Sequence, residues 1–138
     1  MHVTGKQADP SYEAVCDYIK EHTPGQATIL YLPGISQQAG SASFDDFDGY
    51  PDMARKTQRD RFVYHFAAPI SPDAEKTLEW YRRILLKESI IEGSQDICTA
   101  LEDEKVDYIL TAFELENSDC YDLMFQSKDY RLYELIRN

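Results

Sequence analysis

The last third of the chain constrains its fold more than any other part. Residues 106–112 form a nearly continuous apolar run, and residues 123–135 follow after a short polar excursion. Apolar and polar side chains alternate from Tyr130 to Leu135, which is the period of a strand with one buried face. A buried strand followed by such a hairpin closes an α/β sheet with an antiparallel edge. We find no catalytic pattern within this stretch.

The first third predicts a helix followed by a buried strand. Asp9 and Pro10 suit the cap and the first position of a helix. This helix is expected to end at Thr-Pro-Gly, residues 23–25. The apolar face of this helix has members at helical spacing: Tyr12, Val15, Cys16 and Ile19. Residues 27–32 are apolar almost throughout, which favours a strand covered on both faces.

The middle of the chain predicts a second strand and two more helices. Residues 62–66 are rich in β-forming side chains, and Ser71 with Pro72 opens the strongest helix. We expect one apolar face on that helix, formed by Ala74, Leu78, Tyr81 and Leu85 and flanked by Trp80 and Ile84. Residues 88–93 interrupt the pattern. Ser94 then suits the cap of a further helix that carries Ile97, Cys98 and Leu101.

The expected elements are, in order, α, β, a long loop at residues 33–60, β, α, α, β and a hairpin. Strands that alternate with helices predict a mainly parallel sheet flanked by helices. The expected fold class is therefore α/β with three layers, a small mostly parallel sheet flanked by helices and a C-terminal antiparallel hairpin. We expect a disordered lead-in at residues 1–8 and a single domain at residues 9–138, which is large enough to bury a core.

The charge balance excludes one large class of partners. The chain carries 25 acidic and 14 basic residues, a formal net charge of −11. Because nucleic acids and anionic lipids are bound mainly through Lys and Arg, we expect no nucleic-acid partner. The chain has no run of about 18 apolar residues that would suggest a membrane span, and residues 1–10 lack the apolar part of a signal peptide. On these signals alone the chain is cytoplasmic, or a soluble piece of a longer protein.

The three cysteines are spread singly along the chain, at Cys16, Cys98 and Cys120. They lack the close pairs of a zinc site and are too few for a disulfide framework. We therefore expect small side chains near the core, with a Cys16–Cys98 or a Cys98–Cys120 bridge left open. We expect neither a metal nor a cofactor.

An acidic group surrounds Gly49 and consists of Asp45, Asp46, Asp48 and Asp52. It superficially resembles a calcium loop, but an EF-hand loop starting at Asp46 would need Asp or Asn in place of Tyr50 and Glu in place of Thr57. A solvated acidic loop is the favoured interpretation, and an irregular cation site is the alternative. Asp45, Asp46 and Asp48 are kept as candidate binding residues.

His65 lies within an expected strand and is a candidate binding residue. A nucleophile triad needs a base beside Ser or Cys, oriented by a carboxylate. Ser41 or Ser43 could supply the nucleophile of a small hydrolase with His65. There is no GxSxG elbow to support this arrangement, so a histidine in the core or at its rim is the favoured interpretation.

The one basic cluster of the chain consists of Arg55, Lys56, Arg59 and Arg61. It could hold a phosphate or a lipid head group, which makes Arg61 a further candidate binding residue. Gly-rich phosphate loops of the GxGxxG or GxxxxGK type are absent from the sequence. The favoured interpretation is a solvated helix face whose cations pair with nearby aspartates.

Three segments together resemble a family pattern. Residues 12–24 (YEAVCDYIKEHTP) lead into the strand at 27–30, and residues 61–66 (RFVYHF) precede a helix start at 71–76 (SPDAEK). The third part combines VDYIL, within residues 97–110, with DYRLY, within residues 125–133. In this order they resemble the soluble extracytoplasmic C-terminal region of polytopic membrane glycosyltransferases that use lipid-linked sugar donors, and of related membrane proteins of unknown function. The resemblance covers residues 12–136.

The resemblance implies that the catalytic carboxylates and the donor site lie in the membrane-embedded part of a parent chain, so no catalytic residue is carried over to this one. It also implies an extracytoplasmic location. The implied partners are the membrane-embedded part of the same parent chain and a sugar or lipid-linked acceptor. The chain departs from the pattern at residues 33–60, where family members have a shorter connection.

Three functional hypotheses follow. The leading one is a non-catalytic extracytoplasmic accessory domain of a membrane glycosyltransferase-like protein, in which the parent chain is the enzyme. The alternative is a free-standing cytoplasmic α/β module that binds a small ligand at the carboxyl ends of its strands, where open α/β sheets place ligands. A small Ser/His hydrolase is the third.

Overall fold

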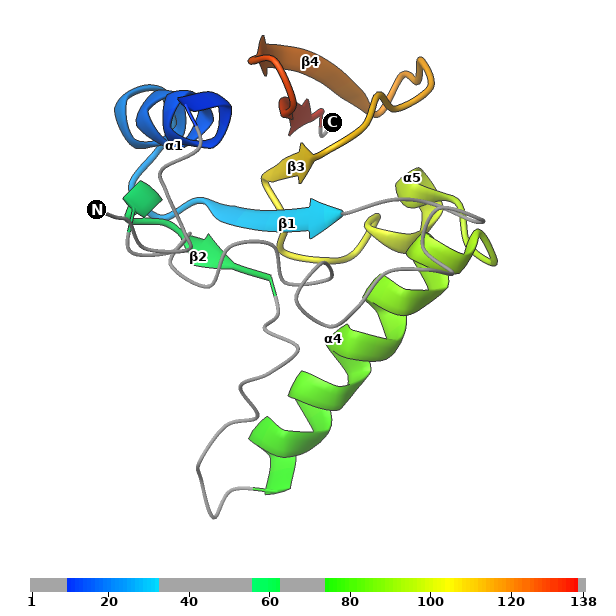
Figure 1. Ribbon diagram of the computed structural model, residues 1–138. Helices are drawn as coiled ribbons and strands as arrows, with labels where there is room; N and C mark the ends of the chain where they lie inside the picture. The colour runs from blue at the N-terminus through cyan, green and yellow to red at the C-terminus, as the bar shows by residue number, and fades with distance from the viewer. Residues whose placement is uncertain (1–9, 33–55, 63–73, 137–138) are drawn as a thin grey trace, which may run out of the picture.

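A five-stranded sheet organises the protein (Figure 1). The structure, a computed structural model, describes residues 10–32, 56–62 and 74–136. The sheet has the order β2-β1-β3-β5-β4. Its strands are β1 (Thr28–Leu32), β2 (Asp60–Arg61), β3 (Tyr108–Thr111), β4 (Tyr121–Gln126) and β5 (Arg131–Leu135).

The pairing of the strands confirms the predicted C-terminal hairpin. β1 runs parallel to both β2 and β3, whereas β5 is antiparallel to β3 and to β4. The described sheet is therefore mixed, with a parallel half and an antiparallel half. The second strand was expected at residues 62–66. β2 instead comprises Asp60 and Arg61, and residues 63–66 lie outside the described part of the chain.

Helices flank this sheet: α1 (Pro10–His22), α4 (Ala74–Glu92) and α5 (Ile97–Ala100). In β1, every residue is buried, as expected for a strand covered on both faces. Because successive side chains of a strand point to opposite faces, Ile29 and Tyr31 join a core cluster with α1, while Leu30 and Leu32 join a second cluster with α4 and α5. Figure 1 shows α1 and α4 on opposite sides of β1.

The predicted apolar face of α1 is confirmed. Tyr12, Val15, Cys16 and Ile19 are all buried in the cluster that includes Ile29 and Tyr31 of β1. The helix ends where the sequence predicted, since Thr23 donates both its backbone N–H and its hydroxyl to the carbonyl oxygen of Ile19. These two hydrogen bonds satisfy a carbonyl group in the last turn of the helix, where intrahelical donors run out.

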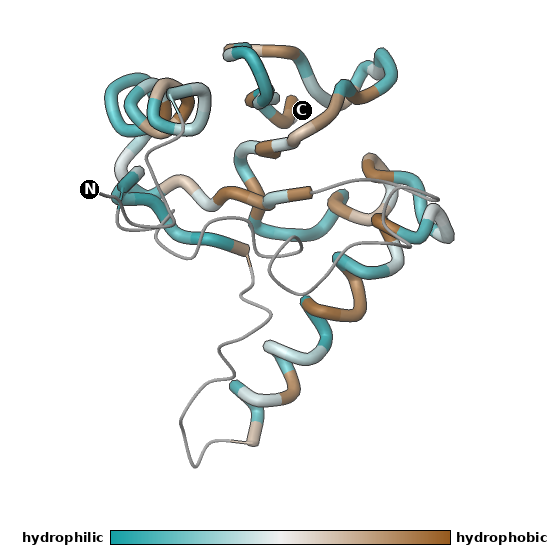
Figure 2. Tube along the Cα trace, viewed as in Figure 1, coloured by the Kyte–Doolittle hydropathy of each residue, from teal (hydrophilic) through white to brown (hydrophobic). Residues whose placement is uncertain are grey.

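The predicted face of α4 is wrong. Leu78, Tyr81 and Leu85 are exposed by 66%, 53% and 47%, and Ala74 is exposed as well. The buried side chains are Ile84, Lys87, Ile90 and Ile91. At 100° per residue the buried side chains lie on a different face of the helix from Leu78, Tyr81 and Leu85. Figure 1 also shows that the first half of α4 projects away from the sheet. Apolar residues nevertheless recur along the projecting half, as Figure 2 shows.

The expected break at residues 88–93 is also wrong, because α4 continues without interruption to Glu92. Gly93 follows with a φ of 84°, a left-handed conformation that glycine adopts without a Cβ clash and that commonly ends helices. The cap of α5 is Asp96, whose side chain accepts a hydrogen bond from the N–H of Thr99, and not Ser94 as the sequence suggested.

Candidate functional site

Arg61 is the one candidate binding residue from the sequence that falls within the described residues. Its side chain is buried, with a residue exposure of 5%, and β2 pairs it with Ile29 of β1. A buried guanidinium is not part of an exposed basic patch for phosphates or head groups. The remaining candidates, His65, Asp45, Asp46 and Asp48, lie outside the described residues, as do Ser41 and Ser43.

Two other members of the basic cluster, Lys56 and Arg59, make local structural contacts, and Arg55 lies outside the described residues. The Nζ of Lys56 donates to Glu13 of α1 at 2.6 Å. Arg59 donates from Nε to the hydroxyl of Thr23 (2.9 Å) and from Nη2 to the carbonyl oxygens of Thr23 (2.7 Å) and Lys20 (3.0 Å). The expected pairing with aspartates is therefore wrong for Arg59, which binds the end of α1. For Lys56 it stays a prediction, because the nearby aspartates lie outside the described residues.

One of the two disulfides left open by the sequence is present. Cys98 of α5 is bonded to Cys120, which directly precedes β4, and their Cα atoms lie 5.9 Å apart. Cys16, on the buried face of α1, is not part of a disulfide. The hydroxyl of Ser118 lies 3.0 Å from the sulfur of Cys98. The bridge joins α5 to the connection between β3 and β4.

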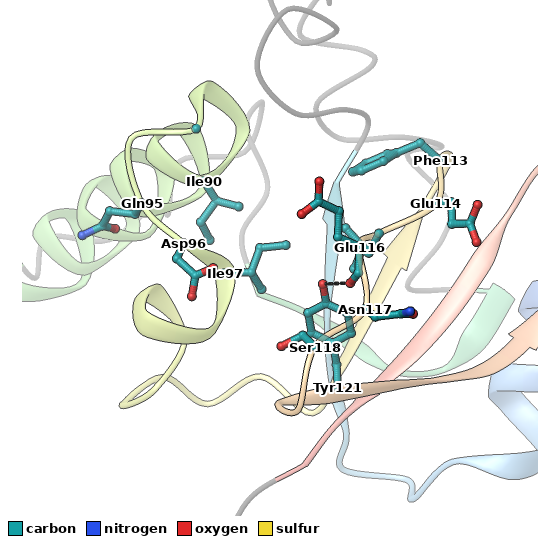
Figure 3. Close-up of a pocket in the computed structure, with 12 residues that line it drawn as sticks. Ile90, Gln95, Asp96, Ile97, Phe113, Glu114, Glu116, Asn117, Ser118 and Tyr121 are labelled. Carbon is teal, nitrogen blue, oxygen red and sulfur yellow. Dashed lines mark hydrogen bonds between the residues drawn. The ribbon is translucent and has the colours of Figure 1, made fainter.

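A pocket of about 490 Å³ lies beside this disulfide, at the carboxyl end of β3 (Figure 3). One wall comes from the end of α4 and the start of α5, and the other comes from residues 113–118 and Tyr121. The described lining residues are Ile90, Gly93, Gln95, Asp96, Ile97, Phe113, Glu114, Leu115, Glu116, Asn117, Ser118 and Tyr121. The carboxyl ends of strands are where open α/β sheets place ligands.

Side chains fix the irregular backbone of the second wall. The hydroxyl of Tyr133 accepts a hydrogen bond from the N–H of Leu115 at 2.9 Å, and the hydroxyl of Tyr121 donates to the carbonyl oxygen of Glu116. Thr111 donates from its hydroxyl to the carbonyl oxygen of Phe113. These bonds pair backbone groups that a strand or helix would otherwise pair, so the wall has a defined shape.

The electrostatics of this pocket are acidic. Asp96, Glu114 and Glu116 line it, and none of its described lining residues is Lys, Arg or His. The pKa of the Tyr121 hydroxyl is raised, first by burial and then by the charges of Tyr133, Asp96 and Glu116. Negative charge therefore converges on the position of Tyr121.

A second hollow of about 400 Å³ lies at the opposite, amino ends of the parallel strands. Its lining includes Lys105, Asp107 and Glu134. Asp107 already has a structural role, because its carboxylate accepts a hydrogen bond from the N–H of Thr28 at 2.8 Å and so holds the start of β1. We assign no function to this hollow.

Sequence reasoning missed a buried cation, Lys87 of α4. Its residue exposure is 1%, and its Nζ lies 5.7 Å from the centre of the Tyr31 ring near the end of β1. A contact of this length between an ammonium and an aromatic face is favourable. The helical spacing of Lys87 with Ile84, Ile90 and Ile91 placed it on the buried face, but the sequence also offered Leu78, Tyr81 and Leu85 as that face.

Within residues 10–32, 56–62 and 74–136, no group of three or more His, Cys, Asp or Glu side chains is arranged to hold a metal ion. None of the helices in the same part of the chain is long and apolar enough to cross a membrane. The described site thus consists of an acidic pocket with an aromatic and aliphatic lining in a mixed α/β fold.

Comparison of the chain with protein-family models, with curated proteins and with solved structures finds no match in any of the three.

Proposed function

We propose that the chain is an extracytoplasmic accessory domain, without a catalytic centre of its own, of a membrane glycosyltransferase-like protein. In this proposal the sheet is the middle of three layers, with α1 on one side and α4 and α5 on the other. The partner is the membrane-embedded part of the same parent chain, and a sugar or lipid-linked acceptor lies nearby. The resemblance of residues 12–136 to such regions motivates the proposal.

The disulfide between Cys98 and Cys120 is the observation that carries the proposal. Disulfides form and persist in oxidising compartments and are rare where glutathione and thioredoxin keep thiols reduced. This bond therefore supports an extracytoplasmic setting over a cytoplasmic one.

The projecting half of α4 gives further support, because it offers a surface for a partner. Leu78, Tyr81 and Leu85 recur at helical spacing and are each about half exposed or more. Exposed apolar rows on soluble domains commonly mark contacts with another protein or with a membrane. In an accessory domain, this row would contact the membrane-embedded part of the parent chain.

The test is fractionation of cells that naturally produce the chain, with free thiols blocked by N-ethylmaleimide at lysis. We expect an antibody to the chain to detect it in carbonate-washed membranes, at a mass well above the 16.0 kDa of these 138 residues. After reduction, a maleimide-linked polyethylene glycol should add two tags, one for each cysteine of the disulfide. A 16.0 kDa species in the soluble fraction, with all three thiols already blocked, would contradict the proposal.

A second candidate function is a free-standing module that binds a small ligand. The pocket at the carboxyl end of β3 favours it, since this is the ligand position of open α/β sheets. The disulfide weighs against the cytoplasmic setting first considered for such a module. The fractionation also separates the two candidates, because a free-standing module is recovered without a membrane-bound parent chain.

A further inference from the structure

We propose that the pocket beside the Cys98–Cys120 disulfide binds a small organic cation, an alkylammonium group carried by a short apolar chain. This inference rests on the second candidate function and names the ligand class of that same pocket. It does not require the chain to be part of a membrane protein.

The charge of the lining selects a cation. Asp96 comes from the cap of α5 and Glu116 from the opposite wall, and both line the pocket. Figure 3 shows the Glu116 carboxylate at the gap between the two walls, the Asp96 carboxylate at the start of α5, and Glu114 turned away. No basic side chain is among the described lining residues to neutralise them. Two carboxylates on facing walls favour an ammonium group between them and repel an anion.

The apolar part of the lining selects the rest of the ligand. Ile90, Ile97 and Leu115 are buried core residues whose surfaces reach the pocket, and Phe113 is packed against the same cluster. An apolar chain of a few carbons that covers these surfaces gains about 0.8 kcal/mol for each methylene group buried. A purely inorganic cation would gain nothing from this lining.

Aromatic rings add to the selection. Phe113 and Tyr121 both line the pocket, and the faces of aromatic rings attract ammonium groups, quaternary ones included. The ring of Tyr121 is held in place by an edge-on contact with Tyr133, at 5.4 Å between ring centres. Its hydroxyl also donates a hydrogen bond to the backbone carbonyl oxygen of Glu116.

The pocket walls are also held in position before any ligand arrives. The disulfide fixes α5 to the strand-connecting segment, and the hydroxyls of Tyr133 and Tyr121 fix that segment's backbone at Leu115 and Glu116. A site that is ordered in advance loses less conformational entropy on binding. This arrangement distinguishes the pocket from a patch of acidic side chains on a mobile surface.

The experiment titrates the full, oxidised chain with four probes, each built on a chain of six carbons. These are hexyltrimethylammonium, hexylamine, hexanol and hexanoate. Binding is followed through the backbone amide chemical shifts of residues 90–97 and 113–121 in NMR spectra. We expect saturable shifts of these residues with the two cations, at least tenfold weaker binding of hexanol and no binding of hexanoate. Equal binding of hexanol and hexylamine would overturn the ligand class, while binding of any tail at this pocket would leave the second candidate function standing. Absence of saturable shifts with all four probes would overturn the inference.

Single variants test the two carboxylates. Glu116→Gln and Asp96→Asn each remove one charge, and asparagine still caps a helix, so α5 is retained. Because each carboxylate is partly exposed to solvent, we expect each variant to weaken hexylamine binding about threefold to tenfold. The matched control is Glu21→Gln on α1, an exposed residue outside the pocket, with affinity unchanged within twofold.

The variants must remain folded for this comparison, which urea unfolding of each one checks. A folded Glu116→Gln variant that binds hexylamine as tightly as the parent would overturn the assignment of the charge contact. Binding should weaken for the parent in 0.5 M salt and much less for a variant that combines Glu116→Gln with Asp96→Asn, since salt screens exposed charge pairs. The same salt dependence in both would point to a cation held elsewhere and would also count against the inference.

Discussion

Arg59 closes the end of α1 with a single guanidinium. Besides making its three contacts with Thr23 and Lys20, it donates from Nη1 to the carbonyl oxygens of Gln58 (2.9 Å) and Thr57 (3.3 Å). The last carbonyls of a helix lack intrahelical donors and carry partial negative charge, so a cationic donor is favourable there. The planar fork of arginine can reach several such oxygens at once.

We therefore expect Arg59→Ala to lower the free energy of unfolding by about 1–3 kcal/mol, because several carbonyls lose a charged donor together. Arg59→Lys should recover less than half of this loss, since an ammonium cannot span the same set of oxygens. Urea unfolding followed by circular dichroism measures both values. Lys128→Ala, at an exposed position of the hairpin, serves as the control and should change stability by less than about 0.5 kcal/mol. A similar loss in both alanine variants would show that Arg59 has no special role.

Glu79 is the carboxylate with the clearest pH dependence. Hydrogen bonds from Arg82 and then Arg83, with N–O distances of 2.8 Å, lower its pKa from 4.5 to about 2. The folded state thus favours the ionised form, so the stabilisation is complete above about pH 4.5 and is lost as the pH falls toward 2. Because the carboxylate is 43% exposed, screening limits the gain to about 1 kcal/mol or less.

Glu79→Gln should accordingly destabilise the protein by up to about 1 kcal/mol at pH 7, and the difference from the parent should shrink between pH 4.5 and pH 2. Urea midpoints measured at several pH values test this. Glu92→Gln, an exposed change in the same helix, provides the comparison and should show no such trend. A difference that grows on acidification would contradict the assigned pKa direction.

The basic residues also show what sequence could not supply at this scale. Charge and spacing identified Arg55, Lys56, Arg59 and Arg61 as a cluster, and they suggested nearby aspartates as partners. The structure instead gives Arg59 carbonyl oxygens, and it shows Lys56 bonded to a glutamate on α1. A carbonyl becomes an acceptor only once a helix ends beside the arginine, so no local pattern predicts the pair.

Among the elements, α1 was predictable and α4 was not. α1 has one apolar face, and the strand after it is apolar on both sides. The helix can therefore bury its apolar side chains only by turning that face toward the sheet. α4 carries two overlapping apolar rows, one with Leu78, Tyr81 and Leu85 and one with Ile84, Ile90 and Ile91. Helical periodicity accepts both rows, and the choice depends on which face of the helix the sheet covers.

The disulfide stabilises the connection between two elements, α5 and β4. Its cysteines are separated by 22 residues, and closing a loop of that size in the unfolded chain corresponds to about 3 kcal/mol in the chain-entropy model. We expect the Cys98→Ser, Cys120→Ser double variant to be less stable than the oxidised parent by about 2–4 kcal/mol in urea unfolding. Dithiothreitol should lower the parent to a similar level and leave the double variant unchanged. An effect of dithiothreitol on the double variant would show that the loss has another source.

For the whole molecule, the mixed sheet and its terminal hairpin could be predicted, but the pocket could not. Strand and hairpin patterns are local, and β4 and β5 pair as neighbours in the chain. The pocket joins residues 90–97 to residues 113–121, which meet only because β3 brings the second segment beside the first. Its residues are ordinary core and surface types, so nothing in the sequence marked Asp96 and Glu116 as members of one site.

The two core clusters predict that the described fold unfolds as one unit. β1 and β3 pair from Ile29 to Leu32, and alternate residues of both strands belong to the cluster under α1 and to the cluster under α4. If either α1 or α4 detached from the sheet, it would expose β1 and β3, whose side chains also form the cluster on the other face. Two natural probes report the two sides: the lone Trp80 packs against the α4 cluster, and Cys16 is buried in the α1 cluster.

In the oxidised chain, Cys16 keeps its thiol, because the other two cysteines form the disulfide. We expect Trp80 fluorescence and pulsed labelling of Cys16 by a thiol reagent to change with the same urea midpoint and slope, as two-state unfolding requires. Cys16→Ala, with Trp80 alone followed, checks that labelling does not itself drive unfolding. Labelling of Cys16 at urea concentrations that leave Trp80 fluorescence native would show that α1 detaches separately. The sheet would then remain folded with only one of its faces covered, and its shared strands would not couple the two clusters.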